Sequence, residues 1–439
     1  MGGWLRHVRY GEPLDLSVLM SDTLRLPRDS EQLANGVSLD KPEALTVACY
    51  TFPHYHRCSY NDRLYAPGWT EYQLARGCRP WFEGHHQPRT PLLGELDERA
   101  PDTWGIYNAL AADHGVDVFI WDCYWFDGQP ALHEALDEGF LGAANLDRLR
   151  FAVMWTNHIW PVQYPVLEGA NIARHQVVAR PPETAPDVWR SLSYLVSRYL
   201  HHPRYWRIDD RPVLVIWSAD QLVATLGRDG ATEMLVELRH HAQRLGHHDI
   251  HIHTTQGSQS TLRELEELGF DSYGLYNPIL IAGAARPEAE ELADYEVVAA
   301  DVVRTVWPSV DARSSLQCFP SVSPGWDTSP RYFAPKRDRT PDRKSWPGLR
   351  PIVIDETPAA FEAFVRSAFA YLNARPSYSK VLTIGCWNEW TEGQYLLPDT
   401  RLGYGMIRAL GAALGRLPQE LPGVSGLDVP AGERFPLNA

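Results

Sequence analysis

Apolar positions along the chain follow two alternating patterns. Short runs rich in β-branched and aromatic residues alternate with longer stretches of helical spacing, from about residue 45 to about residue 414. The short runs predict strands at residues 45–50, 116–122, 150–155, 212–217, 249–254, 270–273, 316–320 and 380–386. The longer stretches predict helices at 103–114, 131–143, 186–200, 231–245, 261–268, 287–306, 357–374 and 402–414.

Eight strands in strict alternation with helices predict an α/β fold, the (β/α)8 TIM barrel. The glycine fingerprint of a dinucleotide-binding fold is absent from the sequence. Three strand-to-helix connections are long, at residues 51–102, 156–185 and 321–356, and such βα loops lie on the C-terminal face, where barrel enzymes place their chemistry. The predicted domains are an N-terminal extension (1–44), a catalytic barrel (45–416) and a C-terminal tail (417–439).

Composition narrows the range of partners. The 439 residues include 55 Asp and Glu against 41 Lys and Arg, which gives a formal charge of −14. This acidity disfavours nucleic acid and anionic membranes as partners. No apolar run is long enough to span a bilayer, and the first residues lack a secretory pattern, so we expect a cytoplasmic protein. The six cysteines contain no Cys-x-x-Cys pair, which predicts buried free thiols rather than disulfides or a zinc site.

Tryptophan is unusually abundant, since 16 Trp outnumber 13 Phe. Eleven of them fall on the predicted C-terminal face: Trp69, Trp81, Trp121, Trp125, Trp155, Trp160, Trp217, Trp326, Trp346, Trp387 and Trp390. Flat aromatic rings pack against the C–H faces of sugars, so the group predicts a carbohydrate site. For any single Trp, core packing is the better interpretation.

Two carboxylates follow the last predicted strand, in the segment Gly-Cys-Trp-Asn-Glu-Trp-Thr-Glu-Gly at residues 385–393. If the chain turns helically there, Glu389 and Glu392 lie on one side of a single turn. Glycosidases need a carboxyl pair at the scissile bond, one protonated and one ionised. The alternative is structural: two acids favoured by a helix dipole, or paired with nearby arginines.

The segment Trp-Asn-Glu-Trp-Thr-Glu-Gly-Gln-Tyr-Leu-Leu-Pro-Asp-Thr, residues 387–400, resembles the C-terminal motif of the family 99-like glycoside hydrolase domain, a group that includes the WbsX-like proteins of polysaccharide gene clusters. Further blocks match in the same order, over about residues 45–410: 50–56, 68–72, 84–88, 124–126, 155–157, 324–327 and Pro330-Arg331.

The resemblance implies a (β/α)8 barrel acting on α-linked glycans. By motif position, Glu389 would be the base acting on the substrate 2-hydroxyl, and Glu392 the general acid and base at the glycosidic oxygen. Three residues differ from the usual family pattern: Thr391 replaces a His, Leu397 replaces a Glu, and His158 replaces a Glu.

Other polar and aromatic residues of the same face are predicted to bind the sugar, with a loop-bracing role as the alternative for each. They are Tyr50, His56, Trp69, Glu71, His86, Asp122, Tyr124, Trp125, Asn157, His158, Trp160, Trp326, Asp327, Trp387, Asn388 and Trp390. No cofactor and no metal are expected; His251-Ile252-His253 places two imidazoles on one strand face, but no further ligand set accompanies them.

The leading functional prediction is a metal-independent glycoside hydrolase of a poly- or oligosaccharide. Three alternatives stay open: a glycosyltransferase or transglycosidase in polysaccharide biosynthesis, a non-catalytic carbohydrate-binding barrel, and a metal-dependent amidohydrolase-type barrel. The expected partner is a carbohydrate, with no nucleic acid and no membrane. The sequence leaves open the sugar, its linkage, endo or exo action, the stereochemical outcome and the oligomeric state.

Overall fold

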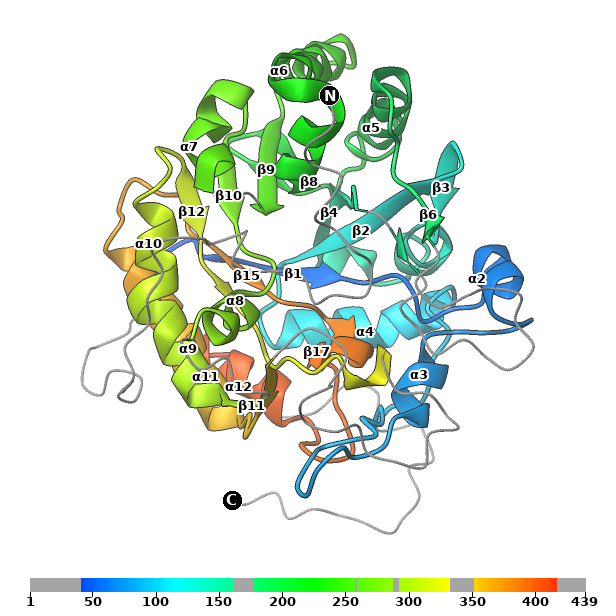
Figure 1. Ribbon diagram of the computed structural model, residues 1–439, viewed down its shortest axis with the longest axis vertical. Coiled ribbons are helices and arrows are strands. Elements are labelled where there is room, and N and C mark those ends of the chain that lie inside the picture. The colour runs from blue at the N-terminus through cyan, green and yellow to red at the C-terminus, as the bar shows by residue number, and fades with distance from the viewer. Residues whose placement is uncertain are drawn as a thin grey trace.

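A computed structural model describes residues 41–158, 160–161, 177–256, 259–286, 292–331 and 351–416. Its centre is a nearly closed barrel of parallel strands (Figure 1). In barrel order the strands are β1 (Thr46–Thr51), β2 (Val118–Phe126), β4 (Arg150–Trp155), β8 (Arg211–Ser218), β9 (His251–Gln256), β10 (Ser272–Gly274), β12 (Gln317–Phe319), β13 (Ser321–Val322) and β15 (Val381–Ile384). The last strand pairs with the first, with Thr46 opposite Val381, so the ends of the barrel sequence meet.

The seventh predicted strand is divided at Pro320. Because proline has no N–H to donate to a strand ladder, the chain pairs on one side before it and on the other side after it. β12 pairs with β10, and β13 pairs with β15. The Pro320 carbonyl still accepts a 3.0 Å hydrogen bond from the Thr383 N–H. β12 and β13 therefore count as one interrupted strand, so the nine strands occupy eight positions around the barrel. This confirms the predicted TIM-barrel class and all eight strand positions.

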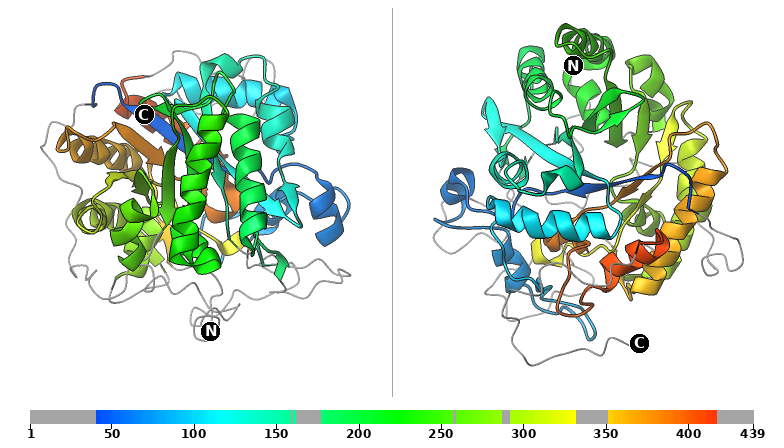
Figure 2. Two further views of the ribbon diagram at one scale, coloured as in Figure 1. Left: turned by 90° about the horizontal axis from the view of Figure 1, so that it is seen from above. Right: turned by 180° about the vertical axis from the view of Figure 1, so that it is seen from behind.

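Helices surround the barrel on the outside (Figure 2). They are α4 (Pro101–Asp113), the π-helix η1 (Ala135–Phe140), α5 (Ala185–Tyr199), α6 (Ala219–Arg244), α7 (Gln259–Leu268), α9 (Tyr295–Asp301), the π-helix η3 (Val302–Val306), α10 (Trp307–Asp311), α11 (Pro358–Asn373) and α12 (Gly405–Ala413). Side-chain caps define several starts: Thr184 and Thr357 each accept a backbone N–H ahead of a proline in the first turn.

The helix α6 begins twelve residues earlier than predicted, at Ala219 rather than 231. The Ser218 side chain caps this earlier start by accepting from the Gln221 N–H at 3.1 Å. Gly227, with φ of 75°, then joins two helical segments across a kink. A glycine inside a helical pattern lowers its helix propensity, so the local pattern concealed the first segment.

The connections between the barrel strands and helices carry short elements of their own. These are α2 (Ser59–Leu64), α3 (Tyr72–Gly77), β3 (Gln129–Ala131), the 3-10 helix η2 (Leu146–Arg148), β5 (Trp160–Pro161), β6 (Val177–Ala179), β7 (Arg207–Ile208), α8 (Pro278–Ala284), β11 (Leu292–Asp294), the 3-10 helix η4 (Ser329–Arg331) and β14 (Ile352–Ile354). The strands β11 and β14 pair with each other beside the barrel. Residues 1–40 of the predicted extension (1–44) and the whole predicted tail (417–439) lie outside the described residues.

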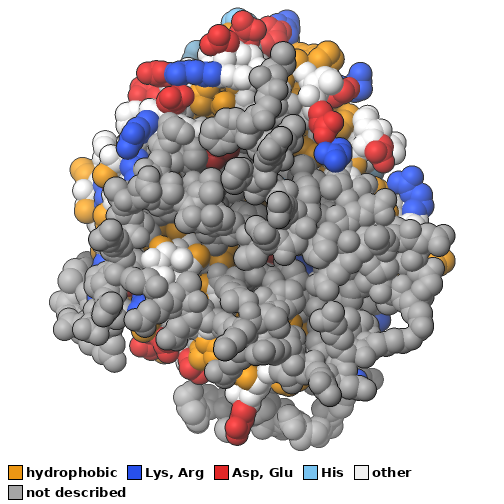
Figure 3. Space-filling view, in the orientation of Figure 1, with side chains coloured by type: hydrophobic (Ala, Val, Ile, Leu, Met, Phe, Trp, Pro, Cys, Tyr) orange, Lys and Arg blue, Asp and Glu red, His pale blue; other side chains and the backbone are white. Residues whose placement is uncertain are grey.

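Charged side chains of both signs alternate on the described surface over α6 and α7 (Figure 3). Arg228 of α6 pairs with Glu264 and Glu267 of α7, and Arg244 pairs with Glu237. Such exposed pairs contribute little to stability. Among the described helices, none combines the length and apolarity that a bilayer crossing needs. All six cysteines are free thiols and five are buried, as the sequence predicted.

Candidate active site

The two motif carboxylates lie on one tight turn. The short strand β16 (Asn388–Glu389) leads into the 3-10 helix η6 (Trp390–Glu392), and β17 (Gln394–Tyr395) returns antiparallel to β16. A 3-10 helix has three residues per turn, so Glu389 and Glu392 fall on the same side, as predicted. Gly393 closes the turn with φ of 64°, a left-handed conformation that favours glycine.

The guanidinium of Arg331 joins both carboxylates. Its Nη2 donates to Glu389 Oε1 at 3.0 Å, and its Nη1 donates to Glu392 Oε1. The same Nη2 donates to Glu71 Oε1 at 3.1 Å, and Nε donates to Thr391 Oγ1 at 3.0 Å. Three carboxylates from two distant parts of the chain therefore surround one buried arginine.

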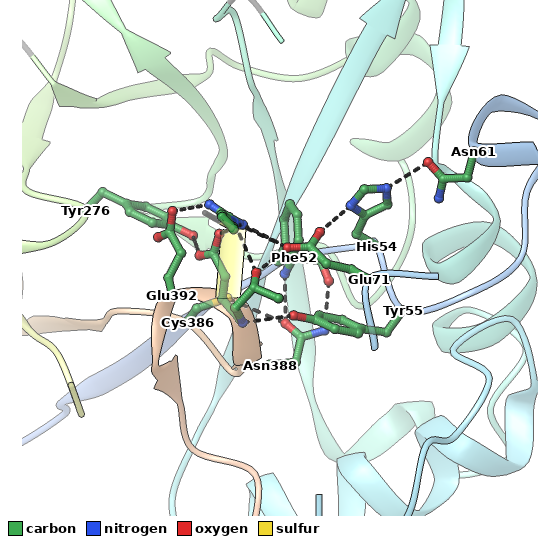
Figure 4. Close-up of polar contacts among 12 residues, drawn as sticks. Phe52, His54, Tyr55, Asn61, Glu71, Tyr276, Cys386, Asn388 and Glu392 are labelled. Atoms are coloured by element: carbon green, nitrogen blue, oxygen red, sulfur yellow. Dashed lines mark hydrogen bonds and ion pairs between the residues drawn. The ribbon is translucent and has the colours of Figure 1, made fainter. Parts of the chain in front are cut away.

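A polar chain runs behind Glu71 (Figure 4). Glu71 Oε1 accepts from the Thr391 hydroxyl, and its Oε2 is bonded to His54 Nδ1. His54 Nε2 is in turn 2.9 Å from Asn61 Oδ1, at the far end of the chain drawn in Figure 4. Burial raises the pKa of Glu71, but Arg331 and His54 lower it further, to about 2. Glu71 is therefore ionised at neutral pH, which balances the charge of Arg331.

The two motif acids have raised pKa values. Burial raises the pKa of Glu389, against the lowering effects of Arg331 and of Tyr276, whose hydroxyl donates to Glu389 Oε2 at 2.8 Å. Burial also raises the pKa of Glu392; Arg331 opposes it, while the charge of Glu389 and a hydrogen bond to Glu389 add to it. Both oxygens of Glu389 accept from donors, so Glu389 is the better placed of the two to be ionised.

Asn388, a predicted sugar contact, is instead part of the support for the turn. It has no exposed surface, and its amide bonds both backbone groups of Phe52: it accepts at 2.9 Å and donates at 2.7 Å. Its Nδ2 also donates to Glu98 Oε1 at 2.6 Å. No sequence motif marks Glu98, which lies within the first long loop. Burial raises the pKa of Glu98 to about 8.

Asp327 also has a bracing role in the structure. Its Oδ2 is bonded to His85 Nε2 at 2.9 Å and to Gln87 Nε2 at 2.6 Å, and its Oδ1 accepts from the Ser329 N–H. Burial raises the pKa of Asp327, but His85 and Arg89 lower it well below its ordinary value. Its own N–H donates to the Glu392 carbonyl. Asp327 therefore holds the turn of Glu389 and Glu392 against the first long loop, and sugar contact by Asp327 stays a prediction.

Asp122 remains the strongest of the predicted sugar-binding carboxyls. It lies in the middle of β2, which continues four residues beyond the predicted strand end, and its Oδ1 has no hydrogen-bond partner among the described residues. Burial, together with the charges of Glu389 and Glu392, raises the pKa of Asp122 well above its ordinary value. A small cavity beside it is also lined by Tyr124, and Tyr124 lies edge-on to His158 with ring centroids 5.9 Å apart. Sugar binding by these three residues stays a prediction.

Most of the tryptophans predicted to line a sugar cleft are instead buried against other aromatic rings. Trp69 stacks on Tyr65, Trp125 packs on Tyr194, Trp387 packs on Phe119, and Trp390 stacks on Tyr395. These four rings and Trp326 are each at least 94% buried. They pack here because large aromatic surfaces gain most from being removed from water. The side chain of Trp160 and the whole of Trp346 lie outside the described residues.

The remaining predicted residues are braced within the protein. His56 is bonded to Glu134 at 3.3 Å, Asn157 bridges the backbone N–H and carbonyl of Ser218, and Tyr50 packs against Tyr276. His86 lines a separate cavity of about 190 Å³ beside Arg89, Glu356 and Arg401. Sugar contact by these residues stays a prediction.

His251 and His253 both bond the Ser272 hydroxyl, at 2.7 and 2.8 Å, inside the barrel. Among the described residues, no group of three or more His, Cys, Asp or Glu side chains could hold a metal ion.

Sequence reasoning missed four residues that the structure brings to the carboxylates: Arg331, Tyr276, His54 and Glu98. Arg331 and His54 lie within blocks that match the family, so a signal existed without a role attached to it. Tyr276 lies just past the end of β10, the strand-end position at which barrel enzymes place functional residues. For Glu98 the sequence carries no signal.

The fold and this site define a TIM barrel with a buried carboxylate cluster at one end of its last strand. Residues 46–410 match the family model described as Glycosyltransferase WbsX. The protein belongs to the WbsX family.

Among curated proteins, the chain is 28% identical over 385 residues to the uncharacterized protein WxcX of Xanthomonas campestris pv. campestris. The match covers 86% of this chain and 51% of WxcX, so the chain spans about half the length of that relative.

Solved structures share the barrel. A glycoside hydrolase-like protein has a TM-score of 0.50 at 12% identity, covering 85% of this chain and 95% of that one. The GH99 endo-α-mannosidase of Bacteroides thetaiotaomicron has a TM-score of 0.47 at 14% identity, covering 84% and 96%. At such identities the likeness is one of fold alone.

Proposed function

We propose that this protein is a glycoside hydrolase that cleaves an α-linked bond in a poly- or oligosaccharide, with Glu389 as base and Glu392 as acid. The observation that carries the proposal is the asymmetric pair on one turn. Arg331 and Tyr276 donate to the two oxygens of Glu389, which favours its ionised form. Burial and the neighbouring carboxylate favour the protonated form of Glu392.

Both acids reach a bound sugar from the same side, because they lie on one 3-10 turn and contact one guanidinium. This arrangement suits the chemistry that the family resemblance implies. Glu389 removes the proton of the 2-hydroxyl, O2 attacks C1, and the bond from C1 to the leaving oxygen breaks as Glu392 protonates that oxygen. Water then attacks C1 as Glu392 takes its proton, the bond from C1 to O2 breaks, and Glu389 returns its proton to O2, which restores both acids to their starting states. No metal takes part.

A second function deserves a test because the family description names a glycosyltransferase. The same two carboxylates could pass the sugar to an acceptor hydroxyl in place of water, which would make the protein a transglycosidase. A transferase that uses sugar nucleotides would need a binding site for their phosphates. The products separate these cases: a free reducing sugar for hydrolysis, a longer glycan for transfer, and a released nucleotide for a sugar-nucleotide transferase.

The test is a screen of defined α-linked oligosaccharides with products followed by NMR, on the wild type, Glu389→Gln and Glu392→Gln. We expect each variant to lose roughly 10²–10⁴-fold in turnover, the usual contribution of a positioned acid or base. Glu362→Gln is the control, because Glu362 pairs with Arg366 on the distant helix α11. Full turnover in both active-site variants, with the fold checked by circular dichroism, would reject the proposal.

A further inference from the structure

The arginine at the centre of the site is unusually constrained. The Arg331 side chain is 10% exposed, and all three of its nitrogens donate to the carboxylates or to Thr391. Its guanidinium also lies over the Phe52 ring, 5.6 Å from the centroid. A planar guanidinium fork in fixed contacts cannot rotate as an ammonium can, so its donors have defined targets. Arg331 therefore fixes the positions of the carboxylate oxygens that accept its hydrogen bonds.

The cluster around Arg331 contains more carboxyl groups than cations. If all three were ionised, Glu71, Glu389 and Glu392 would carry three negative charges, more than Arg331 and a protonated His54 together could balance. Buried charges must be paired, so a proton has to remain in the cluster. Glu71 is bonded on both oxygens, by Arg331 and Thr391 on one and by His54 on the other, and it stays ionised. The proton is left to Glu389 and Glu392.

We propose that Arg331 is a positioning residue that holds Glu389 and Glu392 as a pair sharing one proton, with the Tyr276 hydroxyl favouring the ionised form of Glu389, and that Glu71 and His54 hold Arg331 in place rather than bind sugar. This inference rests on the proposed function. Glu71 is the anchor because it has no exposed surface and accepts from both Nε and Nη2 of Arg331. Loss of Glu71 would remove the one contacting carboxylate that is not itself a proposed reacting acid and that accepts from both Nε and Nη2.

Other ionisable groups face the same cluster and bear on its titration. They are Tyr276 on the loop after β10, Asp122 on β2, Tyr55 and His54 after β1, Glu98 behind Asn388, and Cys386 after β15. Burial raises the pKa values of Asp122, Glu98, Tyr55, Tyr276 and Cys386, which favours the neutral form of each group. Arg331 is the cation in direct contact with both acids, and Glu71 and its partner His54 lie behind Arg331.

The decisive experiment compares the pH profile of kcat/KM for the wild type, Arg331→Met and Arg331→Lys. Arg331 lowers the pKa of both acids, so its loss should raise both, moving both limbs of the bell-shaped profile up by roughly 1–3 pH units. Lysine keeps the charge, so the limbs of Arg331→Lys should stay close to those of the wild type. Limbs that stay in place in Arg331→Met, with only a lower maximum, would overturn the inference.

Glu71→Gln tests the anchor. Loss of the Glu71 charge by itself would lower the pKa of both acids, because that charge raises them. The anchoring role is therefore read from kcat, which should fall more than KM rises because Arg331 loses its position but not its charge. A rise in KM alone, with kcat unchanged, would instead indicate direct sugar binding by Glu71 and overturn the anchoring role. Arg239→Met is the matched control, since Arg239 bonds Asp249 and Asp271 at 2.9 and 2.7 Å near the opposite end of the barrel.

A second measurement needs no substrate. Carbon NMR of protein labelled at the glutamate carboxyls, titrated in the wild type and in Arg331→Met, with Glu389→Gln and Glu392→Gln for assignment, reads both pKa values directly. Upward shifts in Arg331→Met support the inference even if no glycan is hydrolysed, a result that would reject only the proposed function. Unchanged carboxyl titrations would overturn the inference even if hydrolysis is found.

Discussion

At the residue scale, the site depends on which carboxyl groups hold protons. Glu71 and Asp327 are held ionised by cationic and hydrogen-bonding neighbours, whereas Glu98, Asp122 and Glu392 are buried with raised pKa values. The difference arises from partners rather than from depth, since all of these groups are buried. Acids of both kinds side by side are the arrangement from which acid–base pairs are built.

Glu98 makes a prediction about stability. Burial raises its pKa from 4.5 to about 8 in the folded protein, so the folded state binds a proton that the unfolded state has lost between these values. The contribution of Glu98 to the free energy of unfolding is fully present below about pH 4.5. That free energy falls as the pH rises toward 8, by at most ~1.4 kcal/mol per pH unit. Denaturant unfolding at several pH values should show a shallower dependence in Glu98→Gln. Identical dependence in both proteins would contradict the prediction.

At the element scale, one turn positions the reacting groups. The 3-10 helix η6 lies between β16 and β17, and its last carbonyl, that of Glu392, accepts from the Asp327 N–H. Arg331 belongs to η4, so two short helices from distant loops are held together at the site. The geometry of the proposed active site thus depends on the packing of loops beyond the barrel strands.

Gly393 gives the prediction at this scale. It combines φ of 64° with a tight site, where an added Cβ would lie 3.0 Å from Asp327 and 3.2 Å from Arg89. We expect Gly393→Ala to cost about 1–3 kcal/mol from the backbone alone, with more from the clash, and to lower turnover by displacing Glu392. Gly403, with φ of 55° and open space around it, is the control, so Gly403→Ala should lose stability but not turnover. Equal turnover losses would count against a specific role for Gly393.

At the scale of the whole molecule, the abundant tryptophans mainly build the interior. Trp387 follows the last barrel strand, has no exposed surface and packs between Phe119 and Tyr107, with centroid distances of 5.2 and 6.0 Å. Trp104 and Trp121 pack on each other between α4 and β2. The positional bias that suggested a sugar cleft reflects instead how the barrel mouth and its loops are filled.

This interpretation predicts that Trp387→Ala loses about 3–5 kcal/mol of unfolding free energy, the cost of emptying a large aromatic site. Trp189 is only partly buried on α5, so Trp189→Ala should lose less. Denaturant unfolding measures both. A Trp387→Ala protein of normal stability that has lost glycan binding would restore the sugar-binding interpretation of this ring.

The sequence alone was sufficient for the barrel, because strand and helix patterns are local and all eight strands appeared as short apolar runs. It also located the pair at Glu389 and Glu392, since three-residue spacing on a turn is a local property. It placed Glu71 and Asn388 near the sugar, because a sequence shows that a residue is polar but not what it bonds.

Only the tertiary structure decided what surrounds the pair. Arg331 meets Glu71 across 260 residues of chain, and Asn388 meets Glu98 across 290. The burial and the neighbouring charges of each acid depend on every loop that packs at the site. These two factors set the protonation states of the acids. Local pattern determined where the carboxylates stand along the chain, and long-range packing determined which of them is charged.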